Sequence, residues 1–489
     1  MGQALLPGQA MRWGWSRAIA AAALAAGAAI RCLALDDDLW LDEIWSLQMA
    51  GSLRTAVDVF QISVDGNHFL NTLLLYLMGD VAPVLYRLPA LLTGLVAIAL
   101  AFQIGERFWP GCGGAIHALV FATSYPMIVY STEVRGYAPA IACALGIYAV
   151  CTAAQPPAPG AAPGPPPDLS PRQRVLVWSC ALLGFLSHLS FAFFYAAFGV
   201  WSVYRALRTH ASLRAAAGSL LVLHGVPALF LAALYAVVLK DLHSVGGPPW
   251  TYAEVIAQTL GWGLGLPAAL GLLPLAALAA AILLGDAAVR RRTGDDSWVL
   301  LPLAAVVFPA LVVAAREPRL LVPRYFLLGL VFFLIALGAV LTRLFARNRP
   351  LGALALCAVM AGNLVPSVLF VRHGRGDYAD AIRYIAAHSA TGEVVIGSDD
   401  DQRTLRLLSY YRRYLQPEQQ LVYARRADLR QPGPTWLILH SFAQPPQPSL
   451  AITVKAGTSY RLKRSFPYYG PSGTHWFVYR RAELAAARR

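Results

Sequence analysis

Eleven long apolar runs, separated by short polar segments, occupy the first 371 residues of the 489-residue chain. Each run approaches the roughly 20 residues that an α-helix needs to cross a bilayer. Within the hydrocarbon, a helix satisfies all of its backbone hydrogen bonds by itself. The pattern therefore predicts a polytopic α-helical membrane protein with about 11 transmembrane helices. The runs lie near residues 17–35, 83–105, 113–131, 137–153, 174–189, 191–207, 216–238, 267–289, 298–315, 325–342 and 351–371.

The composition agrees with a membrane protein rather than a soluble one. Hydrophobic residues make up 57% of the chain and charged residues 13%, whereas a soluble domain carries about 25% charged residues. No convincing small-x-small cleavage site lies between Ser46 and Ser52, after the first apolar run. A cleavable signal peptide would need such a site, so the first run is predicted to remain as a transmembrane helix.

The formal net charge of +14 is interpreted as a topology signal and not as a nucleic-acid-binding surface. Loops rich in Lys and Arg face the cytoplasm by the positive-inside rule. An odd number of crossings then places the N-terminus in the cytoplasm and the C-terminal region outside the cytoplasmic (inner) membrane. The arginines gather in alternate loops: Arg12 and Arg17; Arg172 and Arg174; Arg205, Arg208 and Arg214; Arg290, Arg291 and Arg292; Arg343, Arg347 and Arg349.

Two polar regions stand apart from the apolar runs. Residues 154–174 contain too many prolines for a helix and are predicted to form a cytoplasmic linker without a chemical role. From residue 372 onward helical and strand-like segments alternate, which predicts a small extracytoplasmic, periplasmic α/β domain over residues 372–489. Its expected helices cover residues 378–388 and 405–414, and its expected strands cover residues 393–396, 421–423, 436–439, 460–466 and 475–479.

An acidic pair, Asp42 and Glu43, follows the first apolar run and has a tryptophan on either side. Tryptophan prefers the headgroup layer of a membrane, so the pair is expected at the outer membrane surface. Carboxylates next to lipid are costly unless they are paired or used. The pair belongs to a predicted first outer loop, residues 36–82, in which the short apolar segment 67–79 suits a helix lying in the interface.

Further polar residues are predicted at the same membrane face, at the ends of other apolar runs. Arginine can hold a leaving phosphate by bidentate, charge-assisted hydrogen bonds, and a carboxylate can take a proton from an attacking hydroxyl or amine. Together these groups suit transfer of a sugar from a lipid-linked phosphate, with inversion at the anomeric carbon. The residues are Asp65 and His68; Arg87; Glu133, Arg135 and Tyr137; and Arg316 and Arg324.

Several segments, in this order, resemble motifs of the GT-C superfamily of polyprenol-phosphate-sugar glycosyltransferases. The resemblance is greatest to glycosyltransferase family 39, which is protein mannosyltransferase-like, and to the lipid A aminoarabinose transferases. It extends over about residues 12–371 and implies a GT-C-like glycosyltransferase domain over residues 1–371. The matching segments are RCLALDDDLWLDEIWS (31–46), DGNHFLNTLLLY (65–76), YRLPALLTG (86–94), YSTEVRGY (130–137) and PRYFLL (323–328).

The resemblance implies that Asp42 is the catalytic base and that Glu43 contacts the acceptor or tunes the base. Arg135 and Arg324 would hold the phosphate of the donor. This sequence departs from the family in having Phe69-Leu70 where the family has Pro-Pro after its histidine. The remaining residues of the implied binding site are His68, Arg87, Glu133, Tyr137 and Arg316.

The implied partners are a polyprenyl-phosphate-linked sugar donor, membrane lipids and an acceptor that is a lipid, a polysaccharide or a protein. No nucleic acid and no cofactor is predicted. The group Asp42, Glu43, Asp65 and His68 would suit Mg²⁺ or Mn²⁺, but its spacing carries no metal signature, so no metal site is predicted. His188 lies at a turn between two apolar runs and is interpreted as structural.

Two other classes of function compete with this interpretation. A transporter, for instance a flippase of lipid-linked sugars, would place paired polar groups near the bilayer midplane of two related halves. Here the charges gather at one face and no repeat is evident. A passive anchor that displays the C-terminal domain would leave the outer acids and arginines without a purpose. Glycosyl transfer is therefore the predicted function, with the flippase as the alternative.

Overall fold

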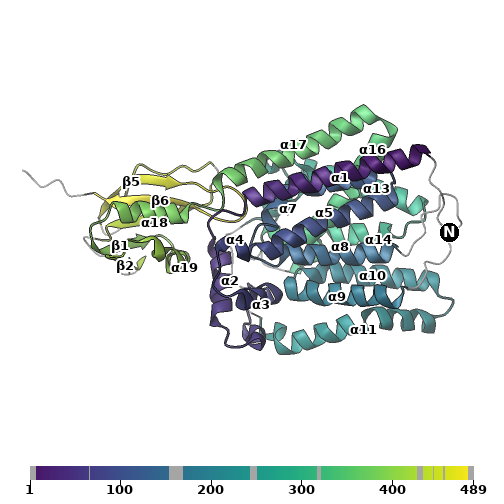
Figure 1. Cartoon of the computed structure of the whole chain (residues 1–489), viewed down its shortest axis with the longest axis horizontal. Coiled ribbons are helices and arrows are strands. Elements are labelled where there is room, and N and C mark those ends of the chain that lie inside the picture. The colour runs from purple at the N-terminus through teal and green to yellow at the C-terminus, as the bar shows by residue number, and fades with distance from the viewer. Residues whose placement is uncertain are drawn as a thin grey trace, which may run out of the picture. The chain divides into compact units, whose positions relative to one another are not determined.

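The computed structural model describes residues 7–64, 66–153, 169–242, 250–315, 321–426, 433–443, 445–454 and 457–482 (Figure 1). The chain divides into two compact units. The helical unit comprises Met1–Leu33 and Met49–Ser367, and the C-terminal unit comprises Ala34–Gln48 and Val368–Arg489. The C-terminal unit is thus built from two segments that are more than 300 residues apart in the sequence.

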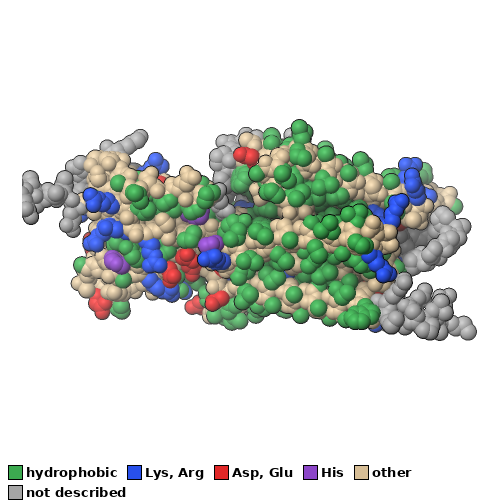
Figure 2. Space-filling view, turned by 90° about the horizontal axis from the view of Figure 1, so that it is seen from above, with side chains coloured by type: hydrophobic (Ala, Val, Ile, Leu, Met, Phe, Trp, Pro, Cys, Tyr) green, Lys and Arg blue, Asp and Glu red, His purple; other side chains and the backbone are tan. Residues whose placement is uncertain are grey.

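The helical unit is a multi-pass membrane structure. Within the described residues, six helices are long and apolar enough to cross a membrane. Figure 2 shows one face of this unit, where hydrophobic side chains cover the middle and basic side chains gather at one end. The helices are α1 (Pro7–Leu33), α3 (Phe69–Met78), α4 (Pro83–Tyr86), α5 (Leu88–Phe108), α6 (Gly113–Thr123), α7 (Tyr125–Tyr130), α8 (Tyr137–Ala153), α9 (Pro171–Ser187), α10 (Phe191–Thr209), α11 (Leu213–Val237), α12 (Tyr252–Leu264), α13 (Leu272–Arg292), α14 (Ser297–Pro302), α15 (Phe308–Ala315), α16 (Leu327–Arg347) and most of α17 (Arg349–His373).

Every predicted apolar run coincides with a helix or with two consecutive helices. The run 113–131 is broken into α6 and α7, and the run 298–315 contains a wider π turn, Leu303–Val307, between α14 and α15. Helix α12 was not predicted. The number of eleven membrane crossings stays a prediction, because several of these helices are shorter than a full span.

The start of α9 differs from the predicted linker. Residues 154–168 lie outside the described part of the chain, but residues 171–174 are helical. Pro171 is tolerated there because the first helical N–H has no intrahelical partner in any case. Ser170 and Gln173 form a reciprocal capping box, with the Ser170 N–H donating to the Gln173 side chain at 2.9 Å. The predicted linker, residues 154–174, therefore extends too far at its C-terminal end, because its last four residues belong to α9.

The break between α6 and α7 is stabilised by a buried arginine from α1. The Phe121 carbonyl oxygen has no partner within the helix, because the Tyr125 N–H that would normally bond to it donates to the Asn363 side chain at 3.0 Å. The Ala122 carbonyl oxygen also has no partner within the helix, because residue 126 is a proline and has no N–H group. Arg31 donates to both of these carbonyl oxygens, at 3.3 and 3.1 Å, and thereby holds α1 against the broken helix.

The C-terminal unit contains a six-stranded mixed sheet of order β2-β1-β3-β6-β5-β4. Strands β1, β2 and β3 are parallel, and β6 pairs antiparallel with both β3 and β5. The α/β prediction is confirmed, and β4 was missed. The elements are α18 (Tyr378–Ala387), β1 (Gly392–Ser398), α19 (Asp401–Tyr411), β2 (Gln419–Ala424), β3 (Trp436–Ser441), β4 (Ala451–Thr453), β5 (Ser459–Phe466) and β6 (His475–Arg481).

The segment Ala34–Gln48 joins this unit through hydrogen bonds to helix ends. Asp37 accepts hydrogen bonds from the Arg375 backbone N–H at 2.7 Å and from its guanidinium at 3.3 Å. Asp38 accepts from the Ala379 N–H at 2.7 Å, in the first turn of α18. Gly374 has a φ of +58°, and a β-carbon there would collide with the Asp37 carboxylate. Glycine thus permits both the helix end and the close approach.

Candidate active site

Four buried residues and the half-buried Arg324, from parts of the chain far apart in the sequence, form a cluster in the helical unit, named here the histidine–arginine cluster. The rings of His68 and His188 lie 4.5 Å apart, and the Tyr137 ring lies 5.4 Å from His68 and 4.3 Å from His188. Arg135 and Arg324 act electrostatically on both histidines. The members are His68, Arg135, Tyr137, His188 and Arg324.

Each member of the cluster lies at or next to the end of a helix. His68 precedes α3, Tyr137 begins α8, and His188 lies in the predicted turn between α9 and α10. Gly136 allows this convergence because a β-carbon at that position would collide with the Ser187 carbonyl oxygen. Irregular backbone at the ends of helices is where a membrane protein can present polar groups to a ligand.

Backbone contacts fix the protonation of both histidine rings. The Gly136 N–H donates to His68 Nδ1 at 2.8 Å, and the Ser190 N–H donates to His188 Nδ1 at 3.0 Å. A nitrogen that accepts a hydrogen bond carries no proton, so in both rings the proton is on Nε2. Burial, followed by the charge of Arg135, lowers the pKa of each histidine well below its usual range. Both rings are therefore neutral N–H donors.

The cluster combines two guanidinium groups with neutral donors. The His68 Nε2 atom is buried and has no hydrogen-bond partner among the described residues, and the same holds for the Tyr137 hydroxyl. Glu133 is fully buried, and its charge acts on the hydroxyls of Tyr130 and Tyr137. Two guanidinium groups lie beside these two unpartnered donors, so the cluster is suited to an anion.

Arg87 is the other predicted residue of this unit that the structure describes. Arg87 is fully buried where α4 ends and α5 begins. It lies about two turns before Gly94, where an added β-carbon would collide with the Ser131 side chain. Ser131 directly follows α7, so Arg87 is on the side of the unit where α7 ends. Arg316 and Asp65 lie outside the described residues.

The acidic pair belongs to the C-terminal unit. Both residues lie in the first turn of α2 (Leu41–Ser52) and both side chains are buried. Glu43 accepts a hydrogen bond from the Trp40 N–H at 3.1 Å. This is the reaching-back contact of a capping box, so Glu43 stabilises the start of the helix.

Asp42 faces an arginine that the sequence did not single out. The Asp42 carboxylate acts electrostatically on Arg406 of α19, and the Arg406 guanidinium lies 4.2 Å from the centroid of the Trp45 ring. Arg406 is more than 360 residues from Asp42, and no motif surrounds it. Only the fold of the C-terminal unit brings the two together.

Comparison with solved structures identifies the fold. The apo structure of ArnT from Cupriavidus metallidurans is 14% identical over 87% of this chain and 93% of that chain, with a TM-score of 0.51. The same protein bound to undecaprenyl phosphate is 12% identical over 95% of this chain and 98% of that chain, with a TM-score of 0.50. The chain has the ArnT fold. No protein-family model and no curated protein sequence matches it.

The ArnT fold confirms the predicted resemblance to the GT-C superfamily and to the lipid A aminoarabinose transferases as a likeness of fold. The Archaeoglobus fulgidus oligosaccharyltransferase is 12% identical over 82% of this chain and 60% of that chain, but its TM-score of 0.44 is too low to carry an argument. The similarity extends over both units of the chain, since it covers 95% of its length in one of the ArnT structures.

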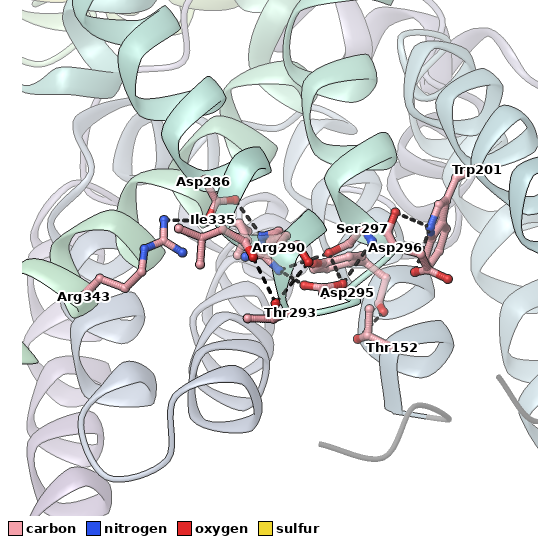
Figure 3. Close-up of polar contacts among 12 residues, drawn as sticks. Thr152, Trp201, Asp286, Arg290, Thr293, Asp295, Asp296, Ser297, Ile335 and Arg343 are labelled. Carbon is pink, nitrogen blue, oxygen red and sulfur yellow. Dashed lines mark hydrogen bonds and ion pairs between the residues drawn. The ribbon is translucent and has the colours of Figure 1, made fainter. Parts of the chain in front are cut away.

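A second polar cluster in the helical unit is built from mutually paired charges (Figure 3). Asp286 binds Arg290 at 2.6 Å and Arg343 at 2.8 Å, and Asp296 binds Arg205 at 3.1 Å. The Trp201 ring N–H also donates to Asp296 at 3.1 Å. Arg290 in addition contacts Asp295. Three carboxylates offset three guanidinium groups, so this network ties α10, α13, α14 and α16 together and is not a candidate active site.

A third polar group lies at the carboxyl ends of β1 and β3 in the C-terminal unit. Asp399 accepts a hydrogen bond from His440 at 2.7 Å, and the other nitrogen of His440 lies 3.4 Å from the Thr404 hydroxyl. This hydroxyl is fully buried and donates to Ser398 at 2.7 Å. A hydroxyl that is buried and already bonded is not available as a nucleophile, so we assign the group to the stability of the sheet.

Proposed function

We propose that the protein transfers a sugar from a polyprenyl-phosphate-linked donor to an acceptor at the outer face of the cytoplasmic membrane. The observation that supports this most is the histidine–arginine cluster, which gathers two guanidinium groups and two neutral N–H donors. The ArnT fold adds support, because one of the ArnT structures is bound to undecaprenyl phosphate. The sugar and the acceptor, whether lipid, polysaccharide or protein, are not part of the proposal.

In the proposed reaction the cluster receives the donor phosphate. Arg135 and Arg324 supply charge, and the Nε2–H groups of His68 and His188 supply directed hydrogen bonds. As the bond from the anomeric carbon to the phosphate oxygen breaks, negative charge grows on the phosphate. Donors that are already in place stabilise this charge without reorganisation, so they lower the barrier.

The proposed base is Asp42. An acceptor hydroxyl or amine attacks the anomeric carbon from the side opposite the phosphate, its proton passes to the Asp42 carboxylate, and the lipid phosphate leaves with the bonding electrons. The configuration at the anomeric carbon is inverted. Arg406 places a positive charge beside the Asp42 carboxylate, and Glu43 acts on the reaction only by fixing the helix that carries Asp42. No metal is part of the proposal.

The test separates binding of the donor from transfer. The purified full chain in lipid nanodiscs is given undecaprenyl phosphate as the binding probe and a panel of polyprenyl-phosphate-linked sugars as donors. Arg135→Gln should reduce binding of the probe at least tenfold and transfer by about 10²–10³-fold, the usual cost of one lost transition-state donor. Asp42→Asn should leave binding unchanged and abolish transfer. Arg54→Gln, at an exposed position, is the matched control.

Two results would overturn the proposal. The first is wild-type binding by a well-folded Arg135→Gln protein, and the second is wild-type transfer by Asp42→Asn. If the wild-type chain binds the probe and moves it across a vesicle bilayer but transfers no sugar from any donor, the flippase is the better description.

A further inference from the structure

A cavity of about 310 Å³ lies among α9, α10 and α11 in the helical unit, three helices that pack against one another (Figure 1). It is lined by the first turn of α9, the end of α10 and the first turns of α11. It is distant from the histidine–arginine cluster, because α9 has 17 residues and rises about 25 Å between its two ends. His188 follows one end of α9, whereas the cavity adjoins the other.

The polar side of the cavity is cationic. Arg174, Arg205 and His210 line it, and no acidic residue does. Arg205 is held in place by Asp296 at 3.1 Å and by the Cys151 carbonyl oxygen at 3.2 Å. The Arg174 guanidinium forms no hydrogen bond or ion pair with the residues that the structure describes. The cavity therefore offers at least one guanidinium group to a ligand.

The other side of the cavity is apolar. Phe198, Leu220, Val222 and Leu223 line it. Helix α11 continues this apolar surface outward, since its side chains include some of the most exposed leucines of the chain. These are Leu213 at 77%, Leu221 at 73% and Leu229 at 74% exposed. A helix with large apolar residues exposed along its length, in a membrane protein, faces lipid tails.

We propose that this cavity binds an acidic phospholipid from the leaflet at the arginine-rich end of the helical unit. The phosphate would be held by Arg174 and by the hydroxyls of Thr209 and Ser219, which also line the cavity, and the acyl chains would lie along α11. Basic pockets between transmembrane helices near the cytoplasmic surface hold anionic headgroups in this way. The site goes beyond the proposed glycosyl transfer and needs none of its residues.

The experiment measures which lipids stay on the full-length protein. The chain is exchanged into nanodiscs of phosphatidylcholine containing phosphatidylglycerol, released, and examined by native mass spectrometry. Phosphatidylglycerol should be retained at least tenfold better than phosphatidylcholine. Arg174→Gln should lower this preference about tenfold, the usual effect of one lost charge-assisted hydrogen bond. Arg172→Gln is the matched control, because Arg172 lies in the same helical turn, is exposed and does not line the cavity.

A second variant tests the apolar half of the site. Gly218 lines the cavity, and a β-carbon there meets no atom within 4 Å. Gly218→Leu should therefore fold normally and fill part of the cavity. Retention of phosphatidylglycerol should fall, while competition by inorganic phosphate should be unchanged.

Three results would overturn the assignment. The first is equal retention of the two lipids by the wild-type chain, and the second is an equal effect of the Arg172 and Arg174 substitutions. The third is full displacement of the lipid by millimolar inorganic phosphate together with unchanged retention in Gly218→Leu, which would assign the cavity to a free anion.

Discussion

At the scale of single residues, the chemistry of the candidate site is decided by backbone contacts. His68 and His188 each accept a backbone N–H at Nδ1, which commits each ring to one tautomer and leaves the proton on Nε2. A protonated ring would lose this acceptor and would place a third cation beside Arg135 and Arg324. Neutral donors are the arrangement that both the geometry and the neighbouring charges favour.

The two histidines predict how the stability of the helical unit changes with pH. Above about pH 6.5 the rings are neutral in both the folded and the unfolded chain, so they do not change the free energy of unfolding. Below pH 6.5 the unfolded rings take up protons, whereas the folded rings, whose pKa values are depressed, do not. The free energy of unfolding should therefore decrease as the pH is lowered, by roughly 1 kcal/mol per histidine at pH 5.5.

Thermal unfolding of the nanodisc-embedded chain between pH 8 and pH 5 measures this effect. His68→Asn is the informative variant, because an amide oxygen can still accept the Gly136 N–H but takes up no proton. The stability that this variant loses between pH 8 and pH 5 should be smaller than the loss in the wild-type chain. An unchanged loss in a variant with both histidines replaced by Asn would assign the effect to other groups.

The acidic pair shows how much of a site is predictable residue by residue. Glu43 accepts the Trp40 N–H, a contact that the sequence does not signal, because a capping box has Ser or Thr where Trp40 stands. Arg406 could not have been found, since its proximity to Asp42 depends on α19 folding against a segment from the other end of the chain. His188 was expected at a turn, which is confirmed, but the sequence does not show that its ring meets His68.

At the scale of elements, the apolar runs predict helices well because length and hydrophobicity are local properties. Interruptions are less predictable. The break at Ser124 could have been expected from Pro126, but the donor to the freed carbonyls comes from α1 and the acceptor for the Tyr125 N–H comes from α17. Strand β4 has only three residues and is too short for an alternating pattern to be recognised.

Arg31 provides a prediction at this scale. Arg31→Lys keeps the charge but replaces a planar group that donates to Ser131 and to three carbonyl oxygens with a single ammonium. At least one carbonyl of the α6 end would be left without a donor, at a cost of about 1–3 kcal/mol. Thermal unfolding in nanodiscs measures the loss, with the neighbouring exposed Cys32→Ala as the control. Equal stability of the two variants would contradict this role of Arg31.

At the scale of the whole molecule, the division into units does not follow the order of the sequence. The predicted C-terminal domain, residues 372–489, was inferred from a change in composition along the chain. Such a change can only delimit one continuous stretch of residues. The segment Ala34–Gln48 follows a transmembrane helix and resembles a loop, yet it is grouped with the C-terminal unit. The proposed base is therefore carried by a segment that the C-terminal unit holds in position.

This arrangement predicts that the C-terminal unit depends on the distant segment. A fragment of residues 368–489 lacks the Asp37 contacts to Arg375, the Asp38 contact to Ala379, and the hydrogen bond from the Tyr411 hydroxyl to the Leu39 carbonyl at 2.8 Å. The Tyr411 side chain is buried in the intact unit. Joining residues 34–48 to the fragment through a flexible linker should raise its free energy of unfolding by about 3 kcal/mol, measured by urea denaturation. The same fusion with Asp37 and Asp38 replaced by Ala should recover only part of the gain, and equal stability of the bare and joined fragments would show that the segment is a passive loop.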